Sequence, residues 1–299
     1  MMPMLESVIG TVLASFIIVI ISTFMALVLD FLFPSFSRWT RTFLFFIVLT
    51  VVLYPAYEHL QMIRSITQTV ATMFISIYPL LTASIIASGG SFSMLNFQPA
   101  MLLFANGAVI LSDKILIPML SAAMLFDIVS RFHPAIPFTK MADLLRGSLI
   151  GLVSALVAAY SIFITAGGTI SWALTGVTSE PIKKLISQNI PLVGSFMTDS
   201  LGAIGRYSSG ASVFIGAWLI VTIWSVALLP TLKTLLTGFL YRWTAAIIEP
   251  FANEEITGIL DDIGKTLFVL CAVSFLVAFA FIYTALFTVI LVKLITVVK

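Results

Sequence analysis

Apolar runs of about 18 or more residues, nearly free of charge, recur along this chain and restrict it to few folds. A helix of that length crosses the ~30 Å hydrocarbon layer of a bilayer. Only 9% of the 299 residues are charged, against roughly 25% in a soluble domain. The runs predict an all-α, polytopic membrane bundle of seven to eight spans. We expect these spans near residues 8–33, 42–57, 66–88, 100–130, 148–174, 212–240 and 266–292.

The segment 178–211 decides between seven spans and eight. It separates two apolar regions but is itself half polar. Its charged side chains are Glu180, Lys183, Lys184, Asp199 and Arg206. We expect an amphipathic or re-entrant element here, because a full lipid-exposed span would bury these charges in hydrocarbon.

An internal repeat is the second large-scale feature. Sliding residues 79–120 onto 191–232 aligns nine identical residues in 42 positions without a gap. Either the chain is duplicated, over about 77–165 and 189–284, or the matches are a coincidence of apolar composition. The duplication predicts N-terminal spans in residues 1–65 and a domain of two repeats, 66–176 and 177–299.

Three charged residues lie deep inside apolar runs, away from the ends of those runs. Asp113 and Lys114 are in the middle of 100–130, and Lys233 is well inside 212–240. An ionisable group at membrane depth costs several kcal/mol unless it is paired or hydrated. Two interpretations compete, namely an ion pair that helps helices pack and a polar lining of a conduit or binding site. We expect a cation, Lys114 or Lys233, to hold Asp113.

Prolines and glycines mark the expected kinks and turns. Pro118 and Pro230 lie inside apolar runs, and each frees the carbonyl four residues earlier. Residues 100–130 would form a helix of about 46 Å, so a tilt or a break is expected there. The full set of expected kink and turn residues is Pro79, Gly89, Gly90, Pro118, Pro191, Gly194 and Pro230.

The sequence contains no pattern typical of an enzyme, a metal site or a nucleic-acid-binding protein. The two histidines and one cysteine have no metal-ligand spacing, and His59 and His133 are expected to be solvated near span ends. The net charge of +2 and the absence of a basic run exclude a nucleic-acid site. The five carboxylates of 249–265 predict a solvated amphipathic helix, opened by Asn253 and two glutamates. We therefore expect no catalytic residue, cofactor or metal.

Several segments, in order along the chain, resemble one known family. They are YPLLTASIIASGGSFSMLNFQPAMLLF, ILIPMLSAAMLFDIVS with MADLLRGSLIGL, IPLVGSFMTDSLGAI, and LLPTLKTLLTGFLYRWTAAIIEPFANEEITGILDDIGKTL. They are similar to the stage III sporulation protein AE family of endospore-forming bacteria, over roughly residues 65–299.

The resemblance implies a function, a location and partners. The expected role is a non-enzymatic membrane subunit of a channel complex that links the mother cell and the forespore. The expected location is the cell membrane, as a multi-pass protein of the mother-cell-derived outer forespore membrane. The implied partners are the other stage III A proteins, stage II protein Q and membrane lipid. The alternative, suggested by Asp113 and Lys114 beside a proline, is a stand-alone secondary transporter for a small solute.

Overall fold

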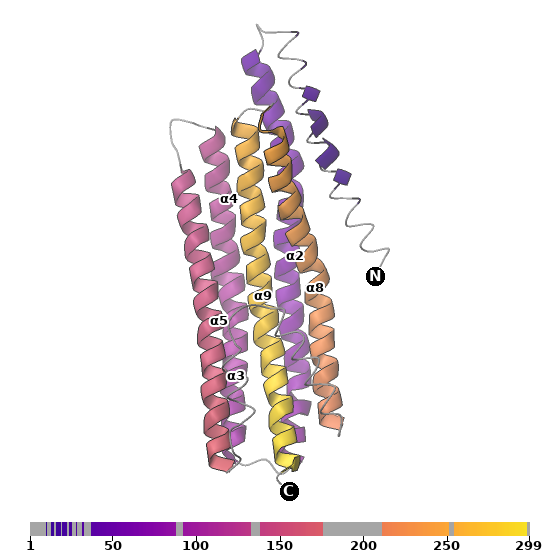
Figure 1. Cartoon of the computed structure of the whole chain (residues 1–299), viewed down its shortest axis with the longest axis vertical. Coiled ribbons are helices and arrows are strands. Elements are labelled where there is room, and N and C mark those ends of the chain that lie inside the picture. Colours follow the sequence, from indigo (N-terminus) through magenta and orange to yellow (C-terminus); the bar gives the residue numbers. More distant parts are fainter. Residues whose placement is uncertain are drawn as a thin grey trace. The chain divides into compact units, whose positions relative to one another are not determined.

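The fold is all-helical throughout the part of the chain that the structure describes (Figure 1). This computed structural model describes scattered residues between 10 and 32, and then 37–87, 92–132, 138–175, 211–250 and 254–297. The elements are α2 (Ser37–Ala87), α3 (Phe92–Leu111), η2 (Ser112–Leu116), α4 (Ile117–Phe132), α5 (Thr139–Thr175), α8 (Ala211–Ile248) and α9 (Glu254–Val297). The all-α prediction is confirmed.

Five helical segments of the described residues are long and apolar enough to cross a membrane. They are Phe45–Pro79, Leu102–Arg131, Thr139–Phe163, Gly216–Ile248 and Glu254–Phe287. This is consistent with a multi-pass membrane protein. Half of the expected span 8–33, nearly all of 178–211, and the residues Gly89, Gly90, Pro191 and Gly194 lie outside the described residues. The totals of seven or eight spans and the internal repeat remain predictions.

The expected break between the spans 42–57 and 66–88 is wrong. Both belong to α2, a single helix of 51 residues that also contains Pro79. The intervening residues 58–65 read EHLQMIRS, and their polarity suggested a loop. However, Glu, Leu, Gln, Met and Arg are all strong helix formers, and the stretch contains neither Gly nor Pro. Polarity alone does not end a helix.

The chain divides into two compact units, and most of the division falls within helices. The first unit comprises Met1–Ile66, Ser112–Leu152 and Leu228–Phe275, and the second comprises Thr67–Leu111, Val153–Ala227 and Leu276–Lys299. Helices α2, α5, α8 and α9 therefore each contribute one segment to each unit.

Helix α9 is the most enclosed of the five membrane-length helices. Of its most apolar stretch, 72% is buried within the protein, against 22–39% for the other four. In Figure 1 it lies between α5 and α8. Small residues on α9 allow close packing in the first unit, where a Cβ placed on Gly264 would lie 2.9 Å from the carbonyl oxygen of Gly238 on α8. The Thr231 and Ser274 hydroxyls of these helices are hydrogen-bonded at 2.7 Å.

The second unit is packed around Tyr160 of α5. Its ring stacks on Phe104 of α3, with 4.6 Å between ring centroids. Its hydroxyl donates to the carbonyl of Ala280 at 2.8 Å and also contacts the Thr284 hydroxyl. Buried hydroxyl groups need such partners, and here α9 supplies both of them.

Replacing Tyr160 with phenylalanine is expected to destabilise the protein by about 1 kcal/mol. The change keeps the stacked ring and removes only the hydroxyl, while Thr284 still donates to the Ala280 carbonyl at 2.7 Å. The unfolding temperature of the full chain in detergent would measure the effect. Tyr160→Ala, which also removes the ring, should cost about 3–5 kcal/mol. Equal losses for the two variants would contradict this account of the core.

Candidate functional site

The expected break in the span Leu102–Arg131 is a π-helical segment, η2. Pro118 occupies the first turn of α4 and has no N–H group, so the carbonyl of Lys114 lacks its usual helical donor. The wider π-helical turn of η2, between α3 and α4, accommodates this missing hydrogen bond. Such turns occur frequently at functional sites. η2 contains both Asp113 and Lys114.

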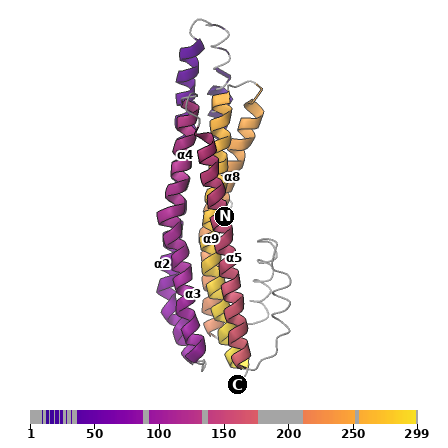
Figure 2. The same ribbon diagram turned by 90° about the vertical axis from the view of Figure 1, so that its left-hand side faces the viewer.

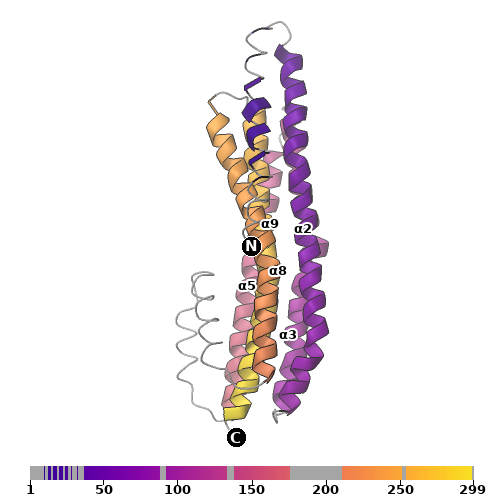
Figure 3. The ribbon, with the colours of Figure 1, turned by 90° about the vertical axis from the view of Figure 1, so that its right-hand side faces the viewer.

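Arg64 of α2 is the principal partner of Asp113. Its Nε donates to Asp113 Oδ1 at 2.5 Å, and the Nζ of Lys114 lies 3.6 Å from Oδ2. The Asp113 side chain is only 13% exposed, whereas that of Lys114 is 72% exposed. Asp113 is therefore held mainly by Arg64, which the sequence did not predict, while Lys114, one of the two predicted cations, makes the longer contact. Figures 2 and 3 show α2 beside α3.

Lys233 is not the partner of Asp113 in the described helices. It is the chain neighbour of Thr234, which contacts His59 of α2. His59 is buried, not solvated, and its Nδ1 lies 3.0 Å from the Thr234 hydroxyl. That hydroxyl donates its hydrogen to the Pro230 carbonyl at 2.9 Å, so the imidazole must be the donor through Nδ1–H. The interior proline of α8 thus belongs to a polar contact with α2.

A charge swap tests the assignment of Arg64. Arg64→Asp or Asp113→Arg alone should destabilise the chain by about 1.5–3 kcal/mol, because each leaves like charges together. The double variant should regain most of the folded protein, measured by size-exclusion chromatography after detergent extraction. The matched pair Asp113→Lys with Lys233→Asp should give no such recovery. Recovery in the second pair but not in the first would show that Lys233 is the true partner.

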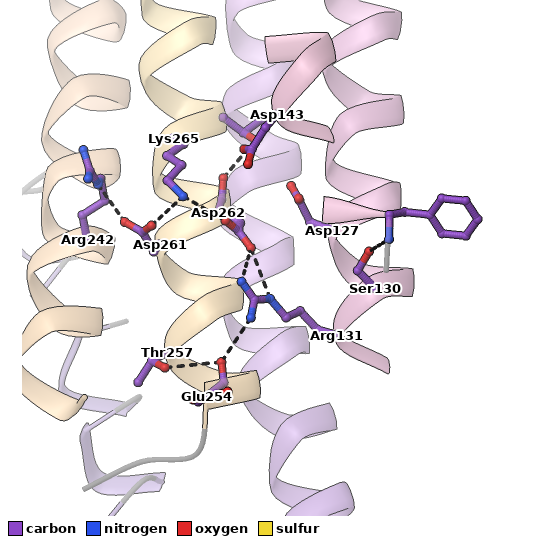
Figure 4. Close-up of polar contacts among 12 residues, drawn as sticks. Asp127, Ser130, Arg131, Asp143, Arg242, Glu254, Thr257, Asp261, Asp262 and Lys265 are labelled. Atoms are coloured by element: carbon purple, nitrogen blue, oxygen red, sulfur yellow. Dashed lines mark hydrogen bonds and ion pairs between the residues drawn. The ribbon is translucent and has the colours of Figure 1, made fainter. Parts of the chain in front are cut away.

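A second polar layer lies near the ends of four helices in the first unit (Figure 4). Its members on α4 and α8 lie shortly before the ends of those helices, and its members on α5 and α9 lie shortly after the starts. All are within eleven residues of a helix end, or about 17 Å. We call this set the helix-end layer. Its charged members are Asp127, Arg131, Asp143, Arg146, Arg242, Asp261, Asp262 and Lys265.

Arg146 joins α5 to two other helices. Its guanidinium pairs with Asp127 of α4 and with Asp143 one turn away, the latter at 2.7 Å. Its Nε donates to the Thr266 hydroxyl of α9 at 3.1 Å. Asp127 is 1% exposed and Arg146 is 5% exposed, so this pair is taken almost entirely out of solvent.

Asp262 of α9, like Arg146 of α5, contacts more than one charged side chain of the layer. Its Oδ2 accepts from Arg131 of α4 at 2.8 Å, and its Oδ1 accepts from Lys265 at 3.2 Å. Lys265 also contacts Asp261, which pairs in turn with Arg242 of α8, both at 2.8 Å. Arg131 needs the space beside Gly258, because a Cβ placed there would overlap the guanidinium. The contacts therefore run from α5 and α4 through α9 to α8.

The interpretation of 249–265 as a solvated helix holds for three of its five carboxylates, because Glu249, Glu254 and Glu255 are exposed. A helix does open at two glutamates, as expected, because α9 begins at Glu254. Asp262, however, is buried and ion-paired. The signal that could have revealed the layer was the spacing of acid and base in Asp143/Arg146 and Asp261/Lys265, since residues three and four apart share a helix face.

The helix-end layer is balanced, with four carboxylates and four cations, and every carboxylate has a cationic partner. Such a set joins helices rather than supplying a reactive group. Among the described residues no group of three metal-ligating side chains occurs. Arg64, Asp113, Lys114, His59 and Lys233, by contrast, lie more than ten residues from either end of the membrane-length segments.

These helices and the mid-span charges define the class as a polytopic helical membrane protein with ion pairs inside its spans. The family model described as "Stage III sporulation protein AE" matches residues 4–292, and the chain belongs to that family. It is similar to the stage III sporulation protein AE of Bacillus subtilis (strain 168), with 26% identity over 214 residues. That alignment covers 72% of this chain and 54% of the relative, so the chain spans about half of its length. No solved structure matches.

Proposed function

We propose that this chain is a non-enzymatic, multi-pass subunit of a channel complex that connects the mother cell and the forespore during sporulation. The observation that carries the proposal is the family match over residues 4–292. Five membrane-length helices and a polar cluster at mid-span support it, because a conduit through a bilayer needs hydrophilic groups at that depth.

The proposed location is the outer forespore membrane, which derives from the mother cell. The proposed partners are the other stage III A proteins and, through the complex, stage II protein Q. Membrane lipid would contact the exposed apolar side chains of α4, α5 and α8, such as Leu125, Ile162 and Trp218.

Deletion of the gene in its own host tests the proposal. The deletion strain should grow normally as vegetative cells but form almost no heat-resistant spores, and forespore gene expression should stop after engulfment. A copy of the gene expressed only in the mother cell should restore spores, whereas a copy expressed only in the forespore should not. Normal spore numbers in the deletion strain would rule the function out.

A stand-alone secondary transporter is the second candidate, favoured by the Arg64–Asp113 contact inside two spans. Membrane-embedded ion pairs recur in transport pathways. Proteoliposomes that contain only this chain separate the candidates, with a mixture of labelled amino acids and sugars as the probe. A lone channel subunit should show no concentrative uptake under an ion gradient, whereas Asp113-dependent uptake would favour the transporter.

A further inference from the structure

One face of α2 is polar at membrane depth. Glu58, Gln61, Ser65, Gln68 and Thr72 follow one another at intervals of three or four residues, so they share one side of the helix. All five are exposed on the protein surface. The first three belong to the first unit and the last two to the second, along one continuous helix. We call these residues the α2 polar face.

The other exposed helix faces are apolar at comparable positions. Leu103, Ile110 and Leu125 are exposed on Leu102–Arg131, and Val221 and Leu232 on Gly216–Ile248. On α2 no large apolar side chain is exposed between Tyr57 and Ile75. The exposed faces of these other helices are therefore suited to contact with lipid, whereas the α2 polar face is not.

The polar face lies in the middle of its span, not at an end. Within Phe45–Pro79, Glu58 is 13 residues from the start and Thr72 is seven from the end, or about 20 Å and 10 Å along the helix. Thr72 satisfies its hydroxyl by donating to the Gln68 carbonyl at 2.9 Å, which lipid would tolerate. Gln61 donates through Nε2 to the Tyr57 hydroxyl at 3.0 Å. A glutamine side chain has two donors and two acceptor sites, and a carboxylate has no donor, so one local contact leaves most of the hydrogen-bonding capacity of this face to be met from outside the helix.

The ion pair with Arg64 brings a further charge to this region. By holding Asp113 it fixes η2 against α2, and Lys114 of η2 is 72% exposed. Lys114 lies 12 residues from Leu102 and 17 from Arg131, or about 18 Å and 26 Å along the helix. A lysine side chain bridges neither distance, so the ammonium cannot reach either end of this apolar stretch by extending along the helix.

We propose that the α2 polar face and Lys114 line a water-filled path through the membrane. The inference rests on the proposed channel function and deepens it by naming the helix that borders the conduit. Water at this face satisfies the carboxylate, the two amides and the ammonium at once. Lipid would satisfy none of them, and an acyl chain carries no group that could pair with Lys114.

Cysteine labelling tests the proposal. The only native cysteine, Cys271, is buried and would be replaced by serine. Gln61→Cys and Gln68→Cys would then be introduced singly into the full chain, in membranes from sporulating cells. The cysteine thiolate, which forms in water and not in lipid, attacks the sulfur of a charged, membrane-impermeant methanethiosulfonate reagent, forming a mixed disulfide and releasing methanesulfinate. Both cysteines should react at least about ten-fold faster than Ile110→Cys and Leu232→Cys, the controls on apolar faces.

Labelling of Gln61→Cys and Gln68→Cys no faster than that of the controls would overturn the proposal, since the α2 polar face would then be covered by lipid or by another protein. Ser65→Cys gives a third position should either glutamine variant fail to accumulate. Spore counts from the same strains keep the two proposals distinguishable. Slow labelling in strains that form normal spores would overturn only the proposal that α2 lines a water-filled path. Normal sporulation of the deletion strain would overturn the proposed channel function, whatever the labelling shows.

Discussion

Replacement of Arg146 by methionine is expected to lower the free energy of unfolding by about 3–5 kcal/mol. The guanidinium pairs with Asp127 and donates to Thr266, and the Asp127 side chain is 1% exposed. Without Arg146 the carboxylate would either remain charged without a cation in a low-dielectric interior or take up a proton to fold. The loss should appear as a large fall in the denaturant midpoint of the full chain in detergent, and as less folded protein in the membrane.

Two matched variants separate this effect from a general weakness of the helix-end layer. Asp143→Asn removes the other partner of Arg146, but Asp143 is 62% exposed, so that change should cost less than about 1 kcal/mol. Combining Arg146→Met with Asp127→Leu should recover most of the stability, because an apolar pair leaves no buried charge. A double variant as unstable as Arg146→Met alone would show that the loss came from packing or from Thr266.

A side chain at the contact between Gly238 and Gly264 is expected to be nearly as damaging. Gly264→Val should destabilise the chain by about 3 kcal/mol, because its Cβ would lie 2.9 Å from the Gly238 carbonyl oxygen. Gly238→Val faces the Gly264 carbonyl oxygen at 3.1 Å. Side chains also obstruct both positions, since Arg242 Cγ would lie 2.5 Å from a Cβ on Gly264 and Leu267 Cβ 3.1 Å from one on Gly238. The two carbonyl oxygens are backbone atoms, so side-chain rotation does not relieve those contacts. The helices α8 and α9 would have to separate along the hydrogen bond between Thr231 and Ser274.

Glycines in open positions supply the control. A Cβ on Gly147 or Gly151 of α5 meets nothing within 4 Å. Gly147→Ala and Gly151→Ala should therefore stabilise the chain slightly, by about 0.5–1 kcal/mol, through helix propensity alone. Thermal unfolding of all four variants would show two losses and two small gains. Similar behaviour at all four positions would mean that the α8–α9 contact is looser than the structure has it.

The sequence alone predicted those features that depend on interactions between residues close together in the chain. Length and apolarity identify membrane-length helices, and Pro118 predicts a fault in Leu102–Arg131 because it cannot donate a hydrogen bond. The helix that opens at Glu254 was predicted from its acidic first turn. The position of Asp113 and Lys114 within an apolar run made them candidate site residues, because a charge in such a run costs free energy in any fold.

Only the tertiary structure decided which partners these residues meet. Arg64 pairs with Asp113 across 49 residues of sequence, and Arg131 reaches Asp262 across 131, separations at which no periodicity carries information. From Leu267 to Phe287 α9 carries no charge and has no polar face, so its sequence could not show that it, rather than α8, is the most buried span. The polarity of residues 58–65 predicted a loop, although these residues lie inside the single helix α2. Composition does not distinguish a chain that leaves the membrane from a helix with one polar face.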